Sequence, residues 1–207
     1  DFYMKAATTD VVDLLQTLFP DKFVFHPDRD NYDYLYQTSD LIGLKGKKYH
    51  TKKNHLNSFK RTYPDYVYTP LNKDLLPACI KYADEWCVQH GCDKDPSLAC
   101  ERDAIKEALT QYEYLGFQGG VIHVNGQLVA FTMGERLNQD TAVIHVEKAN
   151  SELRGVYQAI NQIFCASAWP DMQFINREED MGIPGLRQAK ESYFPVRYIE
   201  KYDVVLK

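Results

Sequence analysis

Three strand-like segments follow one another without an intervening helix, and no other feature of the sequence constrains the fold as strongly. The segments are residues 120–124, 127–134 and 141–148. Asn125-Gly126 joins the first two, and this pair favours a tight two-residue hairpin because both positions accept positive φ. Asn138-Gln139-Asp140 makes the second turn. Strands joined by such short turns pair antiparallel, so this region predicts an antiparallel meander.

Helical and strand patterns alternate around the meander. Apolar spacing predicts helices over residues 10–19, 46–63, 73–90, 95–115, 154–168 and 183–193. Further strands are predicted over residues 23–25, 34–36, 65–71, 172–175 and 196–206. The pattern predicts an α/β (α+β) fold, in which helices flank a mixed, mostly antiparallel sheet. From residue 65 onward, the element order resembles that of the GNAT acyltransferase fold.

Composition limits the function classes. The chain of 207 residues is long enough for one substantial core, or for one domain plus part of another. Its net charge of −5 gives no overall attraction for nucleic acid or anionic lipid, so such contacts require a local basic patch. No run approaches the roughly 20 apolar residues that span a bilayer, and we find no secretory signal. We therefore expect a cytoplasmic protein.

The cysteines and potential metal ligands are scattered. Five cysteines stand at positions 79, 87, 92, 100 and 165, without a CxxC pair. Cys87 and Cys92 are five residues apart, and no second pair stands at zinc-site spacing. We expect reduced thiols, mostly packed in helices. No set of His, Cys and carboxylate residues has metal-ligand spacing, so we predict no metal site and no tightly bound cofactor.

A strongly basic segment stands within this acidic protein. Residues 45–61 hold seven Lys/Arg side chains in 17 positions. On a helical projection, Lys52 falls among the apolar Tyr49, Leu56 and Phe59, which is unusual for a purely solvated cation. The segment suits a polyanion, whether an RNA backbone, a phospholipid headgroup or the phosphates of a coenzyme. A solvated basic helix without a ligand is the alternative.

A second segment combines a carboxylate with the start of a helix. His145 and Glu147 are two apart on a predicted strand, so we expect them to share a face of the sheet. The next helix begins near Arg154-Gly155, where N–H groups attract an anion and glycine lets a backbone approach closely. Glu147 beside such a site predicts a general base for an amine nucleophile. The alternative is a structural ion pair of Glu147 with Lys148, Arg154 or Lys190.

A third segment, residues 172–195, runs from a short apolar strand through a charged break into a helix. Lys190 projects from the apolar face of that helix, which carries Ile183, Leu186, Ala189 and Tyr193. A lysine in a buried stripe extends its ammonium to water, finds an anionic partner or changes its pKa. Burial, charge density and the strand-to-helix junction predict a site here. A lysine whose ammonium simply reaches water is the alternative.

These segments resemble a family of bacterial proteins that is classed with the C-terminal domain of phosphatidylglycerol lysyltransferase. The resemblance covers nearly the whole chain, and its motifs occur in the same order. They are Asp40-Leu41, Gly46-Lys47-Lys48, Lys52-Lys53-Asn54-His55, Glu147-Lys148-Ala149, Arg154-Gly155-Val156-Tyr157-Gln158-Ala159-Ile160-Asn161, Asn176-Arg177-Glu178-Glu179-Asp180-Met181-Gly182, Gly185-Leu186-Arg187-Gln188-Ala189-Lys190 and Tyr193-Phe194-Pro195.

The resemblance implies a GNAT-like fold that often occurs in tandem. Residues 1–40 would then be the remainder of an N-terminal GNAT-like half, whose beginning the chain would lack. Residues 41–207 would form a C-terminal GNAT-like domain, preceded by the basic helix at about 46–63.

The resemblance also implies an activity. In that lysyltransferase the domain moves an aminoacyl group from aminoacyl-tRNA to a lipid hydroxyl, and Fem-type peptidoglycan aminoacyltransferases share the tandem fold and the tRNA donor. The implied partners are tRNA and anionic phospholipid, with peripheral contact at the inner membrane face. The pyrophosphate loop of coenzyme-A-dependent GNATs reads Gln/Arg-x-x-Gly-x-Gly/Ala, whereas this chain has Glu152-Leu153-Arg154-Gly155-Val156-Tyr157. Bulky Tyr157 near the second small position disfavours coenzyme A without excluding acyl-CoA as donor.

We therefore predict an acyltransferase that moves an aminoacyl group to a lipid or another amine or hydroxyl acceptor. Glu147, or His145 through a water, would take the nucleophile's proton, and Lys190 would stabilise the developing oxyanion. The donor would be bound by Arg154, Gly155, Tyr157, Arg187, Lys52 and Lys53. The pocket would be lined by Asn161, Asn176, Arg177, Asp180 and Tyr193. Replacing Lys190 with Met should then preserve folding and remove donor binding.

Two other functions fit the same sequence. One is an acetyl-CoA-dependent N-acetyltransferase acting on a small amine, which acetyl-CoA would stabilise against heat. The other is a non-catalytic module that binds tRNA or anionic lipid through the basic helix. Binding by such a module should depend strongly on salt and should not depend on Glu147. The sequence does not define the oligomeric state.

Overall fold

The computed structural model describes residues 2–207, and the chain divides into two compact units. The central unit is Thr38–Gln173. The terminal unit combines the two ends of the chain, Asp1–Gln37 and Phe174–Lys207. This division differs from the sequence boundary expected near residue 40, because the C-terminal segment folds together with the N-terminal one.

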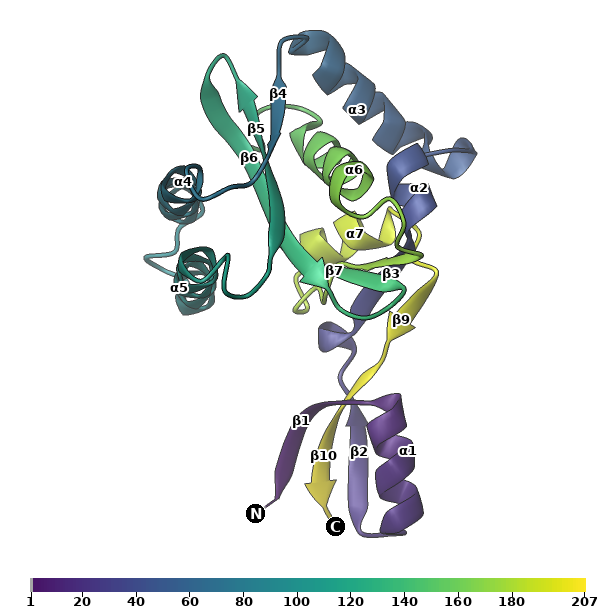
Figure 1. Ribbon diagram of the computed structural model, residues 1–207. Coiled ribbons are helices and arrows are strands. Elements are labelled where there is room, and N and C mark those ends of the chain that lie inside the picture. Colours follow the sequence, from purple (N-terminus) through teal and green to yellow (C-terminus); the bar gives the residue numbers. More distant parts are fainter. Residues whose placement is uncertain (1) are drawn as a thin grey trace. The chain divides into compact units, whose positions relative to one another are not determined.

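The central unit is built on the predicted meander. Its strands pair antiparallel in the order β4-β5-β6-β7 (Figure 1). They are β4 (Val67–Pro70), β5 (Gln118–Val124), β6 (Gln127–Arg136) and β7 (Thr141–Ala149). Asn125 and Gly126 have φ values of 51° and 76°, which the predicted tight turn requires. The meander is therefore confirmed.

Helices cover both faces of these strands. They are α2 (Thr38–Gly43), α3 (His50–Thr62), α4 (Leu76–Gln89), α5 (Pro96–Thr110) and α6 (Val156–Ala168), with a 3-10 turn η2 (Lys47–Tyr49). Figure 1 shows α4 and α5 on one side of the strands and α6 on the other. Buried Leu109, Phe131 and Met133 belong to the core beneath α4 and α5. Helices α2 and α3 pack against α6 instead.

A β-bulge interrupts the pairing of β6 with β7. Met133 pairs with Val146, but the next residue, Gly134, pairs with Ile144, so His145 is an extra residue on β7. A Cβ at Gly134 would stand 2.0 Å from a backbone carbonyl oxygen of β7. Only glycine allows this close approach, and the alternation of side chains along β7 shifts by one at His145.

The terminal unit contains two sets of paired strands, ordered β1-β10-β2 and β8-β3-β9. The strands are β1 (Tyr3–Thr8), β2 (Phe23–Pro27), β3 (Asp33–Gln37), β8 (Phe174–Asn176), β9 (Arg197–Ile199) and β10 (Lys201–Leu206). Its helical elements are α1 (Thr9–Leu18), η1 (Arg29–Asn31) and α7 (Pro184–Glu191). Strand β1 was not predicted, and the strand predicted over residues 196–206 is divided in two at Glu200.

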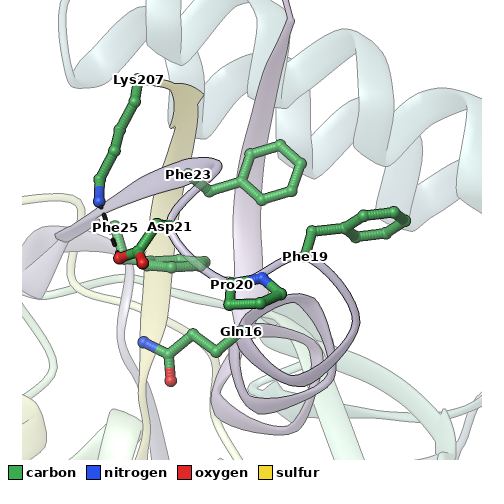
Figure 2. A pocket seen from close by; sticks show the side chains of 7 residues that line it. All are labelled: Gln16, Phe19, Pro20, Asp21, Phe23, Phe25 and Lys207. Atoms are coloured by element: carbon green, nitrogen blue, oxygen red, sulfur yellow. Dashed lines mark hydrogen bonds and ion pairs between the residues drawn. The ribbon is translucent and has the colours of Figure 1, made fainter.

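A hollow of about 350 Å³ lies in the terminal unit (Figure 2). Phe19, Phe23 and Phe25 form the aromatic part of its wall, and the ring centroid of Phe23 lies 6.1 Å from that of Phe19 and 6.4 Å from that of Phe25. Asp21 and Lys207 also line it and form an ion pair of 3.2 Å. The described residues that line the hollow include none of the predicted site residues.

One prediction about the cysteines is wrong. Cys87 and Cys92 form a disulfide, with Cα atoms 5.3 Å apart, instead of remaining reduced. The chain reverses at the end of α4 through Gly91, whose φ is +80°, and the N–H of Cys92 donates to the carbonyl of Cys87 over 3.1 Å. This reversal brings the two side chains together. Cys79 and Cys165 are buried thiols, and Cys100 is an exposed one.

Neither a membrane-spanning helix nor a metal-binding cluster occurs among the described residues. Among residues 2–207, no helix has the length and apolar character needed to cross a membrane. Within the same residues, no group of three or more His, Cys, Asp or Glu side chains is arranged to hold a metal ion.

Candidate functional site

Glu147 and Asn161 meet on the side of the central sheet that α6 covers. Glu147 lies near the end of β7, and Asn161 lies in the second turn of α6. The Nδ2 of Asn161 donates a hydrogen bond to Oε2 of Glu147 over 2.9 Å. Asn161 is 1% exposed, and its Oδ1 has no hydrogen-bond partner among the residues that the structure describes. A buried amide therefore orients the carboxylate and carries one unused acceptor.

His145 lies on the other side of the sheet. Its Nε2 is 3.1 Å from Oε1 of Glu135, and its ring centroid is 5.5 Å from that of Phe117. Phe117 packs against the core beneath α4 and α5. The prediction that His145 and Glu147 share a face is therefore wrong, because the bulge inserts His145 and shifts the alternation.

Two cations and a histidine gather where α3 passes the start of α6. His55 of α3 is partly buried, and Lys52 lies one turn earlier on the same helix. Burial lowers the pKa of His55, and the positive charges of Arg154 and Lys52 lower it further. Lys53 is exposed next to them on α3. We call Lys52, His55 and Arg154 the cationic group; it is the most basic part of the predicted site.

Gly155 makes this meeting of α3 and α6 possible. Its φ is +89°, and a Cβ at this position would stand 2.1 Å from the carbonyl oxygen of His55. The glycine predicted to admit a ligand therefore admits the backbone of α3. It contributes to the site indirectly, by bringing the basic helix against the start of α6.

Tyr157 and Lys148 are turned inward. Burial raises the pKa of the Tyr157 hydroxyl, and the carboxylates of Glu147 and Glu101 raise it further. Lys148 is 8% exposed, and its Nζ donates to Oε1 of Glu101 over 2.7 Å. The same Nζ lies 3.7 Å from the ring centroid of Trp86. Lys148, one expected structural partner of Glu147, is thus engaged on the α4 and α5 side.

In the terminal unit, a buried carboxylate organises several of the predicted residues. Asp180 is 0% exposed and accepts hydrogen bonds from Nε and Nη2 of Arg187 over 2.9 and 2.7 Å. Arg187 also pairs with Asp30 at 2.6 Å, and Asp180 accepts from the hydroxyl of Tyr34. Although burial alone would raise the pKa of Asp180, hydrogen bonds from Arg187 and Tyr34 hold it well below its usual range. Arg187, predicted to bind donor phosphate, is therefore paired with two carboxylates.

Lys190 holds the loop that follows β8. It is 8% exposed, and its Nζ donates to the carbonyl oxygens of Arg177 and Glu178, the latter over 3.2 Å. Glu178 has a positive φ of 55°, so the loop departs from ordinary backbone geometry where the lysine contacts it. The hydroxyl of Tyr36 donates to the carbonyl of Lys190 over 2.8 Å. The buried lysine thus finds backbone oxygens as its partners.

The remaining predicted residues brace the same loop. Asn176 donates to Asp33 over 3.1 Å, and its Oδ1 accepts the backbone N–H of Glu178 over 2.7 Å. The guanidinium of Arg177 lies 5.0 Å from the ring centroid of Tyr193.

The predicted site residues thus form separate sets within the two units. One set, in the central unit, contains Glu147, Asn161, Gly155, Tyr157, Arg154, Lys52 and Lys53. The other, in the terminal unit, contains Asn176, Arg177, Asp180, Arg187, Lys190 and Tyr193. His55 was not among the predicted site residues, although it stands three residues after Lys52 and therefore on the same helical face. Tyr34 and Arg29 were not predicted either. Arg29 pairs with Asp180 at 3.3 Å, and the contacts of both residues with Asp180 are not visible in local spacing.

The chain is similar to one protein family and to several known proteins. Residues 1–205 match the protein family described as phosphatidylglycerol lysyltransferase, C-terminal. A crystal structure of a conserved protein of unknown function from Bacteroides thetaiotaomicron VPI-5482 is 44% identical, with a TM-score of 0.96, over 100% of this chain and 70% of that one. An uncharacterised protein of Mycoplasmoides gallisepticum is 26% identical over 87% of this chain. The chain spans only 58% of that relative's length.

Two more distant structures define the fold. The structure of L-PGS from Bacillus licheniformis has a TM-score of 0.68 at 15% identity, covering 98% of this chain and 66% of that chain. A tandem GNAT protein from the clavulanic acid biosynthesis pathway has a TM-score of 0.52 at 8% identity, covering 99% of this chain and 62% of that chain. The predicted GNAT-like fold is confirmed. With the match over residues 1–205, the chain belongs to the phosphatidylglycerol lysyltransferase C-terminal family.

Proposed function

We propose that this protein is an aminoacyltransferase that moves an aminoacyl group from aminoacyl-tRNA to an amine or hydroxyl acceptor, a lipid among them. The observation that carries the proposal is the Glu147–Asn161 pair, a carboxylate fixed by a buried amide. Family membership supports it, since the family is named for a lysyltransferase.

The reaction requires removal of one proton from the acceptor. The acceptor oxygen or nitrogen attacks the ester carbonyl carbon of the aminoacyl-tRNA, and the bond from that carbon to the terminal ribose oxygen breaks. The ribose oxygen leaves with a proton. Glu147 is suited to take the acceptor's proton, because Asn161 holds one carboxylate oxygen in place over 2.9 Å.

The donor's phosphates suit the basic part of the central unit. In this proposal the cationic group and Lys53 contact the tRNA backbone. Exposed cations on one helix are typical of contacts to a phosphate backbone, which carry affinity without reading sequence. The N-terminus of α6 adds positive charge at the same junction.

Lys190 and Arg187 receive a different role from the one that sequence alone suggests. Their contacts with backbone carbonyls and carboxylates suit them to hold the loop at residues 176–182. In this proposal they support the site and do not neutralise the donor.

A transfer assay tests the proposal. The full chain is incubated with radiolabelled aminoacyl-tRNAs and either phosphatidylglycerol vesicles or small amines. Transfer should occur to at least one acceptor and be lost in Glu147→Gln, while Glu152→Gln, which changes an exposed carboxylate, should retain it. Acetyl transfer from acetyl-CoA without transfer from tRNA would identify a small-molecule acetyltransferase. Salt-sensitive tRNA binding without any transfer, unchanged in Glu147→Gln, would identify a binding module.

A further inference from the structure

We propose that the acceptor is a primary amine, which binds as its ammonium form between the carboxylate of Glu147 and Oδ1 of Asn161. This inference rests on the proposed aminoacyl transfer and narrows its acceptor from an amine or hydroxyl to an amine. It starts from the one hydrogen-bonding atom of this pair that the protein leaves unused.

Oδ1 of Asn161 is a buried acceptor without a donor among the described residues. Buried side-chain oxygens nearly always have a hydrogen-bond partner, because an unpaired one loses its hydration without compensation. The amide's other end is fixed, since Nδ2 donates to Glu147. The oxygen is therefore held beside the carboxylate, ready for a donor that the protein itself does not supply.

The number of hydrogens on the acceptor decides which group fits. A hydroxyl carries one hydrogen, which a general base takes, so Asn161 Oδ1 would stay unpaired. An ammonium carries three hydrogens and satisfies both oxygens at once. A site whose buried polar groups match one substrate discriminates strongly against an analogue that leaves one of them unpaired.

The same arrangement fits the chemistry of amide formation. One ammonium proton passes to Glu147, and the nitrogen lone pair attacks the ester carbonyl carbon of the donor. A C–N bond forms, the bond to the ribose oxygen breaks, and that oxygen leaves with the second proton. The third hydrogen stays on the product amide. Asn161 Oδ1 accepts one N–H throughout and so directs the lone pair at the carbonyl.

Binding of a simple probe pair tests the ammonium site without any donor. Butylammonium and 1-butanol have the same chain but differ in the polar end. In the 15N-labelled full chain, butylammonium should shift the side-chain Nδ2–H signals of Asn161 in a saturable way, and 1-butanol should not. Equal shifts with both probes, or no shift with butylammonium, would overturn the proposal.

Three variants separate binding from folding. Asn161→Ala should weaken butylammonium binding at least about tenfold, which corresponds to roughly 1.4 kcal/mol. Asn161→Asp keeps an oxygen acceptor but loses the Nδ2 donor to Glu147, and an ammonium between the two carboxylates would offset their repulsion, so it should bind butylammonium more tightly than Asn161→Ala does. Gln162→Ala removes the neighbouring amide, which donates to the carbonyl of Ile42 over 3.0 Å, and should leave binding unchanged. Parallel losses in the Asn161→Ala and Asn161→Asp variants would contradict a direct contact.

The transfer assay separates this inference from the proposed function. Transfer to butylamine, with little or none to phosphatidylglycerol hydroxyls, supports both. Transfer to the lipid hydroxyl alone would leave the aminoacyltransferase standing and overturn the amine acceptor. If neither acceptor is modified, the proposed function fails, and the butylammonium shifts still decide whether the ammonium site exists.

Discussion

Asp180 in the terminal unit and Glu147 in the central unit are both held by neighbouring side chains, but the side chains that hold them differ in their own pairing. Asp180 accepts from Arg187 and Tyr34, and each of its oxygens has a donor. Glu147 is held by Asn161, whose own Oδ1 has no partner among the described residues. Complete pairing inside the protein suits a structural role, whereas the unused buried acceptor is the atom that the proposed ammonium would satisfy.

The same contrast separates the two groups of cations. Lys190 and Arg187 contact carbonyls and carboxylates of their own unit, so their charges are engaged in the fold. Lys53 and Arg154 are exposed on the central unit. This difference favours a supporting role for the first group and, under the proposed function, contact with the donor for the second. Substitutions in the first group should therefore lower stability and leave donor binding unchanged. Substitutions in the second group should lower donor binding and leave stability nearly unchanged.

The largest expected effect is on the reaction rate, from Glu147→Gln. Removing a general base lowers a transfer rate by about 10²–10⁴-fold. The amide keeps the size of the side chain, so the melting temperature should stay close to that of Glu152→Gln. Rates of aminoacyl transfer and melting curves of both variants check this. A rate loss matched by the Glu152→Gln control would show that the charge acts at long range.

The next largest effect is on stability, from Asp180→Asn. The change leaves Arg187 and Arg29 without their buried counter-charge, which should lower the free energy of unfolding by about 3 kcal/mol. We place the value at the low end for a broken buried pair because Arg187 is about a third exposed. Urea unfolding at neutral pH measures it. A variant of unchanged stability that fails to bind tRNA would instead make Asp180 part of the donor site.

Acid should remove the stabilisation that the Asp180 carboxylate gives to the folded state. Its pKa is lowered in the folded state, so the carboxylate stabilises the fold fully above its unfolded pKa of about 4, and this contribution falls as pH drops further. The difference in unfolding free energy between the parent and Asp180→Asn should therefore be constant from pH 7 to about pH 5 and shrink below about pH 4. Urea titrations across this range test the sign. A difference that grows on acidification would contradict the lowered pKa.

Much of the fold could be predicted because its signals are local. Asn125-Gly126 defines a hairpin without reference to the rest of the chain, and Asp95 caps α5 by accepting the N–H of Ser97 over 2.9 Å. The bulge at His145 escaped prediction, because counting alternate residues assumes that no residue is inserted. The constraint lies in the close approach of Gly134 to β7, which is a contact between strands.

The sequence identified unusual residues in the candidate site, but it did not identify the partners of those residues. Lys190 was recognised as buried from helical spacing, but its partners are backbone oxygens, which carry no sequence signature. The second partner of Arg187, Asp30, is 157 residues away, so no local pattern connects them. Residue type and periodicity identify which side chains are unusual, whereas only the fold decides whether a partner already satisfies them.

Lys190 and Lys53 provide a matched test of the two groups of cations. Lys190→Met removes the donor to two carbonyls of the 176–182 loop and should lower the free energy of unfolding by about 1–2 kcal/mol, with tRNA affinity unchanged. Lys53→Met removes an exposed charge, so stability should change by less than about 0.5 kcal/mol while tRNA affinity falls. Melting curves and filter binding at fixed salt measure both. Loss of tRNA affinity in a fully stable Lys190→Met protein would restore the donor role that the sequence suggested.

The smallest expected effect concerns the pH dependence of donor binding. The pKa of His55 is lowered by burial and by Arg154 and Lys52, so the ring is mainly neutral at pH 7. A bound phosphate would favour the protonated ring and raise that pKa, and linkage then requires affinity to rise as pH falls through it. We expect tRNA affinity to increase about threefold between pH 7.5 and 5.5 at constant salt, because protonation adds one positive charge that faces the donor's phosphates. His55→Gln should abolish this increase and leave the affinity at pH 7.5 nearly unchanged, because the neutral ring contributes little charge there. If the increase persists in His55→Gln, another group titrates on binding, and the junction of α3 with the start of α6 is not where the donor's phosphates lie.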